Sequence, residues 1–273
     1  MRKKLWRTAV AALAAAVLAA GAAAADKVAF KDPVGDDDGP GTYSYPTDAV
    51  YTRGSFDLVE FDVEPSGKNV DFGVTVNANL QDPWRMNVGF AVQMAFIFID
   101  VDHKDGSGST AGLPGLNISF APADAWDYCV ILSPQPSSRV KQEIEAKVAA
   151  DLRSHVLVPA RTKGAGRTIS GGVKLADLGG GDPATWGYQV ILQSNEGFPA
   201  DTDLLTRKVN EYEGQHRFGG GNDYDCDPHV MDLLAGKGAG EAGEAEAQHQ
   251  MLAYQCNPDG SAKKGAVLTM VRK

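Results

Sequence analysis

Two short segments of the chain are rich in carboxylates, which are preferred ligands of hard metal ions. The first segment places Asp32 and the run Asp36-Asp37-Asp38 among glycines and prolines. Adjacent carboxylates repel one another, and a cation that takes about six to eight oxygen ligands relieves that repulsion. We therefore expect this segment to bind calcium; a solvated acidic turn is the alternative interpretation.

The second acidic segment, Asp100-Val-Asp102-His-Lys-Asp105, approaches the opening of an EF-hand loop. Its third acid stands one position late, and Ala111 occupies the position of the closing glutamate, so it is no EF-hand. The segment follows an apolar run, so Asp100 and Asp102 lie on one side of a predicted strand end. We expect them to join the first segment in one calcium site; a turn rich in Asp and Gly is the alternative.

Aromatic residues beside predicted turns are the second chemical signal. A flat apolar ring next to polar groups suits a sugar, which has one apolar face and hydroxyls that need hydrogen bonds. Core packing is the alternative for each ring. The predicted carbohydrate-binding residues are Tyr43, Tyr45, Trp84 and Trp126.

Sequence motifs of common enzymes are missing from the chain. It has no H-E-x-x-H, no G-x-S-x-G and no P-loop. Cys226 and His229 have a metal-like spacing, but two ligands make no site. The carboxylate pair of a glycosidase leaves no spacing signature, because the fold sets it. The sequence therefore predicts a binding protein and not an enzyme.

The N-terminus has the order of a secretory signal: basic residues, then an alanine-rich apolar run, then Ala23-x-Ala25. We expect a signal peptide over residues 1–25 and an exported protein, periplasmic or extracellular, with no membrane span after cleavage. An uncleaved anchor is the alternative. Cleavage leaves 22 basic against 35 acidic side chains. This excess of acids repels phosphate backbones, so we expect no nucleic-acid partner.

Export permits disulfides, and the chain has three cysteines. Cys129 lies in a strand-like apolar run, where a buried free thiol is expected. Cys226 and Cys256 lie in loop-like sequence and are the predicted pair, although sequence does not fix the pairing.

The elements that position these residues are predicted to be short strands between Gly, Pro, Asn and Asp clusters, the pattern of a β-sandwich or barrel. We expect one domain over residues 26–273. Residues 139–153 fit both a half-exposed strand and a helix, and their strand neighbours favour a strand. Residues 236–243 are predicted to form a mobile glycine-rich excursion. The predicted strands are 49–52, 56–64, 70–77, 90–100, 117–120, 128–132, 167–174 and 187–193.

The motifs in this order resemble the glucodextranase C-terminal domain family. The opening Asp32-Pro-Val-Gly-Asp36-Asp37-Asp38-Gly-Pro-Gly carries most of the resemblance. Further matching motifs are Gly54-Ser-Phe-Asp57-Leu, Asp82-Pro-Trp84, Leu113-Pro-Gly-Leu-Asn117, Trp126-Asp127, Glu213-Gly-Gln-His-Arg-Phe-Gly-Gly-Gly221 and Asp227-Pro-His-Val-Met-Asp232.

This resemblance implies an all-β antiparallel sandwich of the jelly-roll or DOMON-like type, with long loops and few short helices. It also implies calcium and a role in binding sugar or the cell surface, as an accessory to glycoside hydrolases. Combined with the second acidic segment, the expected calcium ligands are Asp32, Asp36, Asp37, Asp57, Asp100 and Asp102.

Two other functions remain open. DOMON-like sandwiches include periplasmic haem-b electron carriers, in which Met and His ligate iron. The residue types are present, without a spacing that selects a pair, in Met86, Met94, Met231, Met251, His103, His216, His229 and His249. A structural envelope protein that binds a protein partner is the other alternative.

Overall fold

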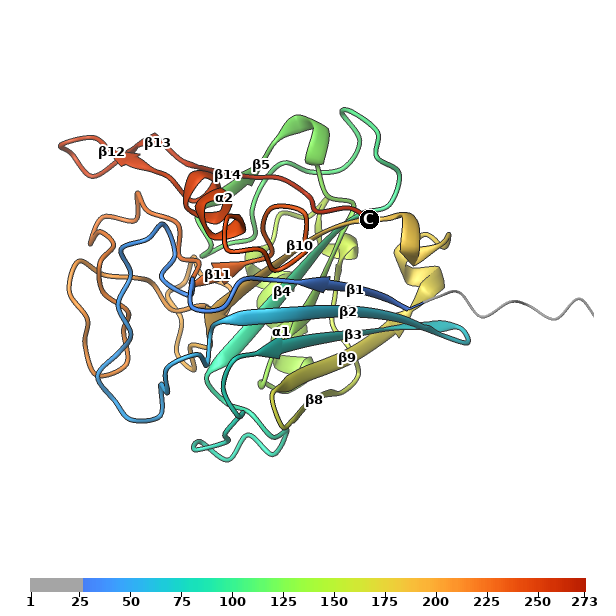
Figure 1. Ribbon diagram of the computed structural model, residues 1–273, viewed down its shortest axis with the longest axis horizontal. Helices are drawn as coiled ribbons and strands as arrows, with labels where there is room; N and C mark the ends of the chain where they lie inside the picture. Colours follow the sequence, from blue (N-terminus) through green and yellow to red (C-terminus); the bar gives the residue numbers. More distant parts are fainter. Residues whose placement is uncertain (1–26) are drawn as a thin grey trace, which may run out of the picture.

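Runs of apolar and alternating residues form strands, and ten of these strands form two five-stranded sheets (Figure 1). The computed structural model describes residues 27–273, so the predicted signal peptide lies outside the described residues. The first sheet is antiparallel, with the order β1-β2-β3-β9-β8. Its strands are β1 (Val28–Lys31), β2 (Leu58–Ser66), β3 (Asn69–Val76), β9 (Thr168–Lys174) and β8 (Thr162–Ala165).

The second sheet has the order β11-β10-β4-β6-β7 and is antiparallel except for the parallel pair β6 and β7. Its strands are β11 (Asp232–Leu233), β10 (Gly187–Ser194), β4 (Gln93–Asp100), β6 (Tyr128–Leu132) and β7 (Val156–Leu157). Every residue of β4 and β10 is buried. Such strands must be covered on both faces.

One face of the second sheet packs on the first sheet and forms the sandwich core. There Phe61 and Phe72 of the first sheet meet Ile97, Val130 and Val190 of the second. The opposite face packs against loops, helix α1 (Ser137–Lys147) and the parallel pair β5 (Ile118–Phe120) with β14 (Ala266–Leu268). The predicted all-β sandwich with long loops and few short helices is confirmed.

Residues 137–147 form a helix, so the preferred strand interpretation of this segment was wrong. Val140 and Ile144 are its buried side chains, and Val148 follows at the same spacing of four. A spacing of four places residues on one face of a strand or of a helix alike. The decisive factor is the apolar outer face of the second sheet, which a helical stripe covers.

Other expectations have mixed outcomes. The predicted strands coincide with β2, β3, β4, β5, β6, β9 and β10, whereas residues 49–52 form a turn. The Cys226–Cys256 disulfide is confirmed, and Cys129 is free and buried in β6. The remaining elements are α2 (Glu244–Met251), β12 (Gln255–Cys256), β13 (Ala262–Lys264), η1 (Pro122–Asp124), η2 (Arg153–His155), η3 (Leu175–Leu178) and η4 (Pro183–Thr185).

Long loops gather at one end of the sandwich, at the left in Figure 1. The blue loop that follows β1 and the orange loops that follow β10 run side by side, joined by a bridge between Ser44 and Gly219. A small aromatic core that includes Phe56 and Phe218 fills the space between these loops. No helix within residues 27–273 has the length and apolar character needed to cross a bilayer.

Candidate functional site

Three buried carboxylates converge where the two sheets meet. Asp32 follows β1, Asp36 lies in the loop after it, and Asp232 begins β11 of the other sheet. Oxygens of these three side chains lie within 4.8 Å of one another. Asp57, which precedes β2, is tied to the same loop because its Oδ2 accepts a hydrogen bond from the Gly35 backbone N–H at 3.0 Å.

Several oxygens of this carboxylate cluster (Asp32, Asp36, Asp57 and Asp232) have no hydrogen-bond partner. Asp36 is 4% exposed, and neither of its carboxylate oxygens is bonded; Asp32 Oδ2 and Asp57 Oδ1 are likewise unpartnered and buried. No ion pair among the described residues includes a member of the cluster. Buried carboxylates without cations or donors are costly, and a hard cation would supply the missing partner.

The remaining oxygens of the cluster are oriented by backbone N–H groups. Asp32 Oδ1 accepts from Ala235 at 3.1 Å, and Asp232 Oδ2 accepts from Leu58 at 2.6 Å. Each of these bonds joins one sheet to the other. The donor set is all oxygen and carries four carboxylates, which fits calcium.

Burial and mutual repulsion raise the pKa of every carboxyl in the cluster. Desolvation, followed by the charge of Asp36, raises the pKa of Asp32 to about 9. Desolvation, followed by repulsion from the charge of Asp57, raises the pKa of Asp36 to about 7. The pKa of Asp57 rises to about 6, and that of Asp232 rises well above its usual range, for the same reasons.

The metal-free protein is expected to lose stability as pH rises from about 4 to about 9. A carboxyl whose folded pKa is raised stabilises the fold fully below its unfolded value near 3.8, and this stabilisation is lost as pH passes through the folded values of about 6, 7 and 9. Urea unfolding in chelator at pH 5 and pH 9 measures the effect. Saturating calcium should remove it; a flat profile in chelator would contradict it.

Helix α2 closes the carboxylate cluster from outside. Gln248 is fully buried; its Nε2 donates to the Asp36 carbonyl, and its Oε1 accepts from the Leu233 N–H at 2.9 Å. The Glu244 carboxylate accepts from four backbone N–H groups of residues 237–241, among them Lys237 at 2.6 Å and Gly240 at 2.8 Å. The glycine-rich segment expected to be a mobile excursion is therefore wrapped around one side chain.

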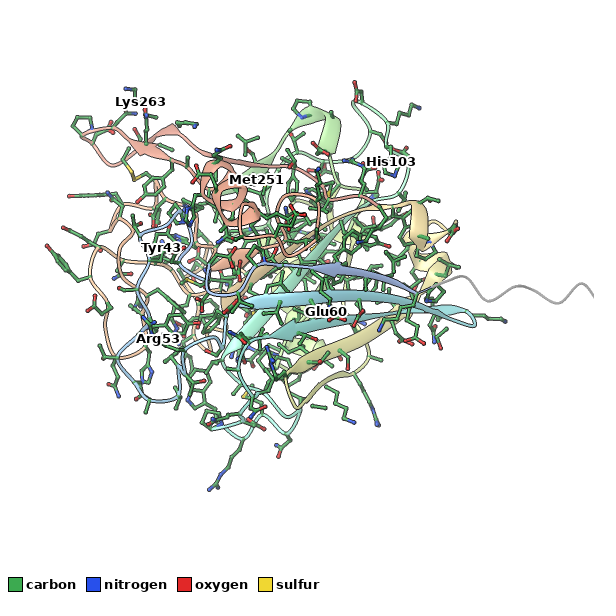
Figure 2. All side chains as sticks on the ribbon, in the orientation of Figure 1. Tyr43, Arg53, Glu60, His103, Met251 and Lys263 are labelled. Atoms are coloured by element: carbon green, nitrogen blue, oxygen red, sulfur yellow. A yellow bond between two sulfur atoms is a disulfide. The ribbon has the colours of Figure 1, made fainter. Side chains whose placement is uncertain are left out.

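A polar hollow of about 560 Å³ lies beside the cluster and is lined by Asp37, Tyr45, Arg53 and Asp57 among others. Figure 2 labels Tyr43 and Arg53 in this region. Asp57 belongs both to the lining of the hollow and to the carboxylate cluster, so the hollow adjoins the cluster on this side.

The structure separates the expected calcium ligands. Asp37 accepts a hydrogen bond from the Tyr45 hydroxyl instead of joining the cluster. Asp100 and Asp102 gather with Asp127, so the single site expected for the two acidic segments is not formed. His103, next to Asp102, lies far from Tyr43 in Figure 2.

The second acidic group is satisfied by protein donors. Asp100 Oδ2 accepts from the Arg272 guanidinium at 2.6 Å, and its Oδ1 accepts from the His103 N–H at 2.9 Å. Asp127 Oδ2 accepts from the Val101 N–H at 2.8 Å. This group therefore lacks the unpartnered oxygens that mark the first cluster.

Asp232 is the cluster member that sequence reasoning did not assign. Its signal is one carboxylate inside the apolar run Val230-Met-Asp-Leu-Leu234. A charged residue at a buried strand position needs a partner. Its partners stand about 200 positions earlier in the chain, so only the fold identifies them.

Two of the predicted carbohydrate-binding aromatics are buried, which corrects their assignment. Trp126 is 1% exposed and donates its indole N–H to the Ala111 carbonyl at 2.8 Å. Tyr43 is 6% exposed and donates its hydroxyl to the Pro228 carbonyl at 2.5 Å. Tyr45 and Trp84 are half-buried against the small aromatic core. Because Trp126 and Tyr43 are buried, neither ring offers an exposed face on which a sugar could stack.

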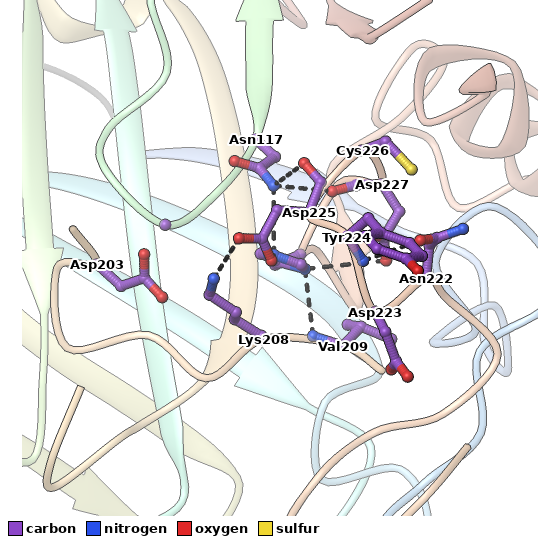
Figure 3. A network of polar contacts seen from close by, with 12 residues as sticks. Asn117, Asp203, Lys208, Val209, Asn222, Asp223, Tyr224, Asp225, Cys226 and Asp227 are labelled. Atoms are coloured by element: carbon purple, nitrogen blue, oxygen red, sulfur yellow. Dashed lines mark hydrogen bonds and ion pairs between the residues drawn. The ribbon is translucent and has the colours of Figure 1, made fainter. Parts of the chain in front are cut away.

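Polar contacts also hold the loop that carries Lys208, Val209 and Asp225 (Figure 3). The His229 Nδ1 accepts from the Val209 N–H at 3.2 Å, and its Nε2 lies 3.6 Å from Asp225 Oδ1. Asn117 Nδ2 donates to the Asp225 carbonyl at 2.9 Å. His229 and the Lys208 ion pair lower the pKa of Asp225 to about 2.

Three of the four histidines proposed for the haem alternative are engaged by polar protein groups, and the fourth, His216, packs against the rings of Tyr51 and Trp84. His249 Nε2 lies 3.0 Å from Asp38 Oδ1, and His103 Nε2 lies 2.5 Å from the Thr185 carbonyl. His229 is held as described above. Met94 and Met231 are packed in the apolar core. These contacts give the haem alternative no support.

Comparison with known proteins agrees with the resemblance seen in the motifs. Residues 28–271 match the family model of the SLH-like C-terminal binding module of glucodextranase. This family is a binding module and not a catalytic domain. A search of the curated proteins finds no match to the chain. Because the family model covers nearly all of the described residues, the chain belongs to the family of SLH-like C-terminal binding modules of glucodextranase.

Proposed function

We propose that the protein is an exported, non-catalytic module that binds a carbohydrate or an envelope glycan and is stabilised by calcium. Membership of the binding-module family supports the binding role. The observation that carries the calcium proposal is Asp36, a buried side chain with two unpartnered carboxylate oxygens beside Asp32 and Asp232.

The proposed calcium ligands are Asp32, Asp36, Asp57 and Asp232. They come from the end of β1, the start of β2 and the start of β11, so the ion would clamp the two sheets to each other. The clamp also fixes the loop after β1, which runs beside the loops that follow β10. Calcium would therefore order the loop end of the sandwich as well as stabilise the fold.

A glycan array probed with the purified protein, first in calcium and then in chelator, tests the proposal. We expect binding to a neutral glycan in calcium and weaker binding in chelator. An ultraviolet-visible spectrum of the same sample tests the haem alternative through its Soret band. Absence of binding to every glycan would reject the carbohydrate role, and identical binding and melting with and without chelator would reject the calcium role.

A further inference from the structure

Three aromatic side chains project from the loop end into solvent. Phe198, Tyr212 and Tyr224 are 95%, 74% and 70% exposed, and they are the exposed aromatics among the large exposed apolar side chains of the described residues. All three lie in the loops that follow β10. Burial of an aromatic ring is strongly favourable, so three rings left in water on one set of loops suggest a ligand surface.

The loop segments that carry Tyr212 and Tyr224 lie side by side. The N–H of Glu211, which precedes Tyr212, donates to Asp223 Oδ1 at 3.0 Å, and Asp223 precedes Tyr224. Figure 3 shows Tyr224 and Asp223 on the same loop as Asp225. This hydrogen bond joins the two loop segments that carry the tyrosines.

Phe198 is joined to the same surface through basic residues. Phe198, Lys208 and Arg217 line one small hollow of about 50 Å³. Lys208 forms an ion pair with Asp225, the residue after Tyr224. These contacts connect the Phe198 loop to the segment that carries Tyr224. We call the surface of these loops the aromatic loop face and define it by Phe198, Tyr212 and Tyr224.

The backbone beside Tyr224 is fixed by a disulfide and by a close packing contact. The Cys226–Cys256 disulfide ties the Tyr224 segment to the hairpin of β12 and β13. Gly260 of that hairpin packs so closely that a Cβ there would lie 2.5 Å from Tyr224 Cβ. A ring on a fixed backbone loses little conformational entropy when a ligand stacks on it.

The surroundings of the rings select the ligand. Four acids, Glu211, Glu213, Asp223 and Asp225, stand beside the tyrosines in the sequence, against the two basic residues Lys208 and Arg217 near Phe198. The excess of acids disfavours an anionic polymer. Isolated rings separated by charged groups also differ from the contiguous apolar centre of a protein interface. Rings for the apolar faces of sugars, with carboxylates to accept from their hydroxyls, fit a neutral polysaccharide.

We infer that the aromatic loop face binds a neutral polysaccharide chain, with Phe198, Tyr212 and Tyr224 stacking on its rings. This inference rests on the proposed carbohydrate-binding function and locates its site. It moves the binding residues away from Trp84 and Trp126, and it places them on loops that sequence patterns leave undefined.

Isothermal titration of the full chain in calcium, with dextran and soluble starch as neutral probes and polygalacturonate as the anionic probe, tests the inference. Phe198→Ala, Tyr212→Ala and Tyr224→Ala are each expected to weaken neutral-glycan binding about three- to tenfold, and together about a hundredfold. Melting temperatures should stay near the wild-type value, because the rings are exposed. Tyr212→Phe and Tyr224→Phe retain the stacking face and should bind nearly as wild type.

The outcomes separate the inference from the proposed function. If wild type binds a neutral glycan and the triple alanine variant binds it equally well, the site assignment is wrong while the function stands. A Trp84→Phe variant that loses more affinity than the triple variant would also overturn it. Tighter binding of polygalacturonate would reject the neutral ligand, and wild type that binds no glycan would reject the function itself.

Discussion

Asp36→Asn is expected to abolish the stabilisation of the protein by calcium and to raise the stability of the metal-free form at pH 8. The bound ion should stabilise wild type by about 4 kcal/mol at a free concentration 1,000 times its Kd, or about 10 °C in Tm for a chain of this size. Asp36 makes no hydrogen bond through its carboxylate, so the substitution removes a ligand without breaking a protein contact.

The higher stability expected for the metal-free Asp36→Asn variant has a separate cause. In metal-free wild type at pH 8, Asp36 adds a buried charge beside Asp32 and Asp57, whereas an amide adds none and can donate to the unpartnered Asp32 Oδ2. Thermal melts should therefore give wild type the higher Tm in calcium and Asp36→Asn the higher Tm in chelator. Asp105→Asn, an exposed acid outside both carboxylate groups, is the matched control. If the variant keeps its calcium-dependent rise in Tm, Asp36 is not a ligand.

Glu244→Ala is expected to lower the free energy of unfolding by about 3 kcal/mol or more, because hydrogen bonds to a charged group contribute about 1.5 to 3 kcal/mol each and are not additive. The carboxylate satisfies four backbone N–H groups of the turn before α2, and the side chain is 6% exposed. Its loss leaves those donors without a partner and loosens the helix that covers Asp36.

Urea unfolding in saturating calcium measures this change through the transition midpoint. Glu246→Gln changes an exposed acid in the same helix and should shift the midpoint little. Glu244→Gln should lie between the two, because one amide oxygen can still accept but the charge is gone. Equal midpoints for Glu244→Ala and Glu246→Gln would show that the turn does not depend on the carboxylate.

Much of the fold follows from local pattern. The apolar runs of β4, β6 and β10 are long enough to predict strands, and Tyr128–Leu132 begins and ends as expected. Local pattern failed at α1, where Val140 and Ile144 satisfy two periods at once and only the face they cover decides between them. It also missed β1, a short edge strand of four residues.

The site was less predictable than the fold. Asp32 and Asp36 were accessible because acids crowd together in sequence, but Asp232 joins them through strand pairing between distant segments. Residue type alone does not say whether a ring points inward, so Trp126 and Tyr43 were assigned to a ligand although their polar atoms bond buried carbonyls. Tyr212 and Tyr224 were overlooked for the same reason.

The buried free thiol of Cys129 bears on how the chain acquires its disulfide. Three cysteines allow three pairings, and Cys129 pairs in the sheet with Phe98 of β4 and Val156 of β7, where burial raises the pKa of its thiol well above its usual range. Thiolates, not thiols, attack disulfides. Once the second sheet has assembled, Cys129 is removed from exchange and one pairing is left. The order of sheet assembly and cysteine oxidation therefore decides which disulfide forms. We expect the native Cys226–Cys256 bond when the sheet assembles first, and non-native bonds to Cys129 when oxidation comes first.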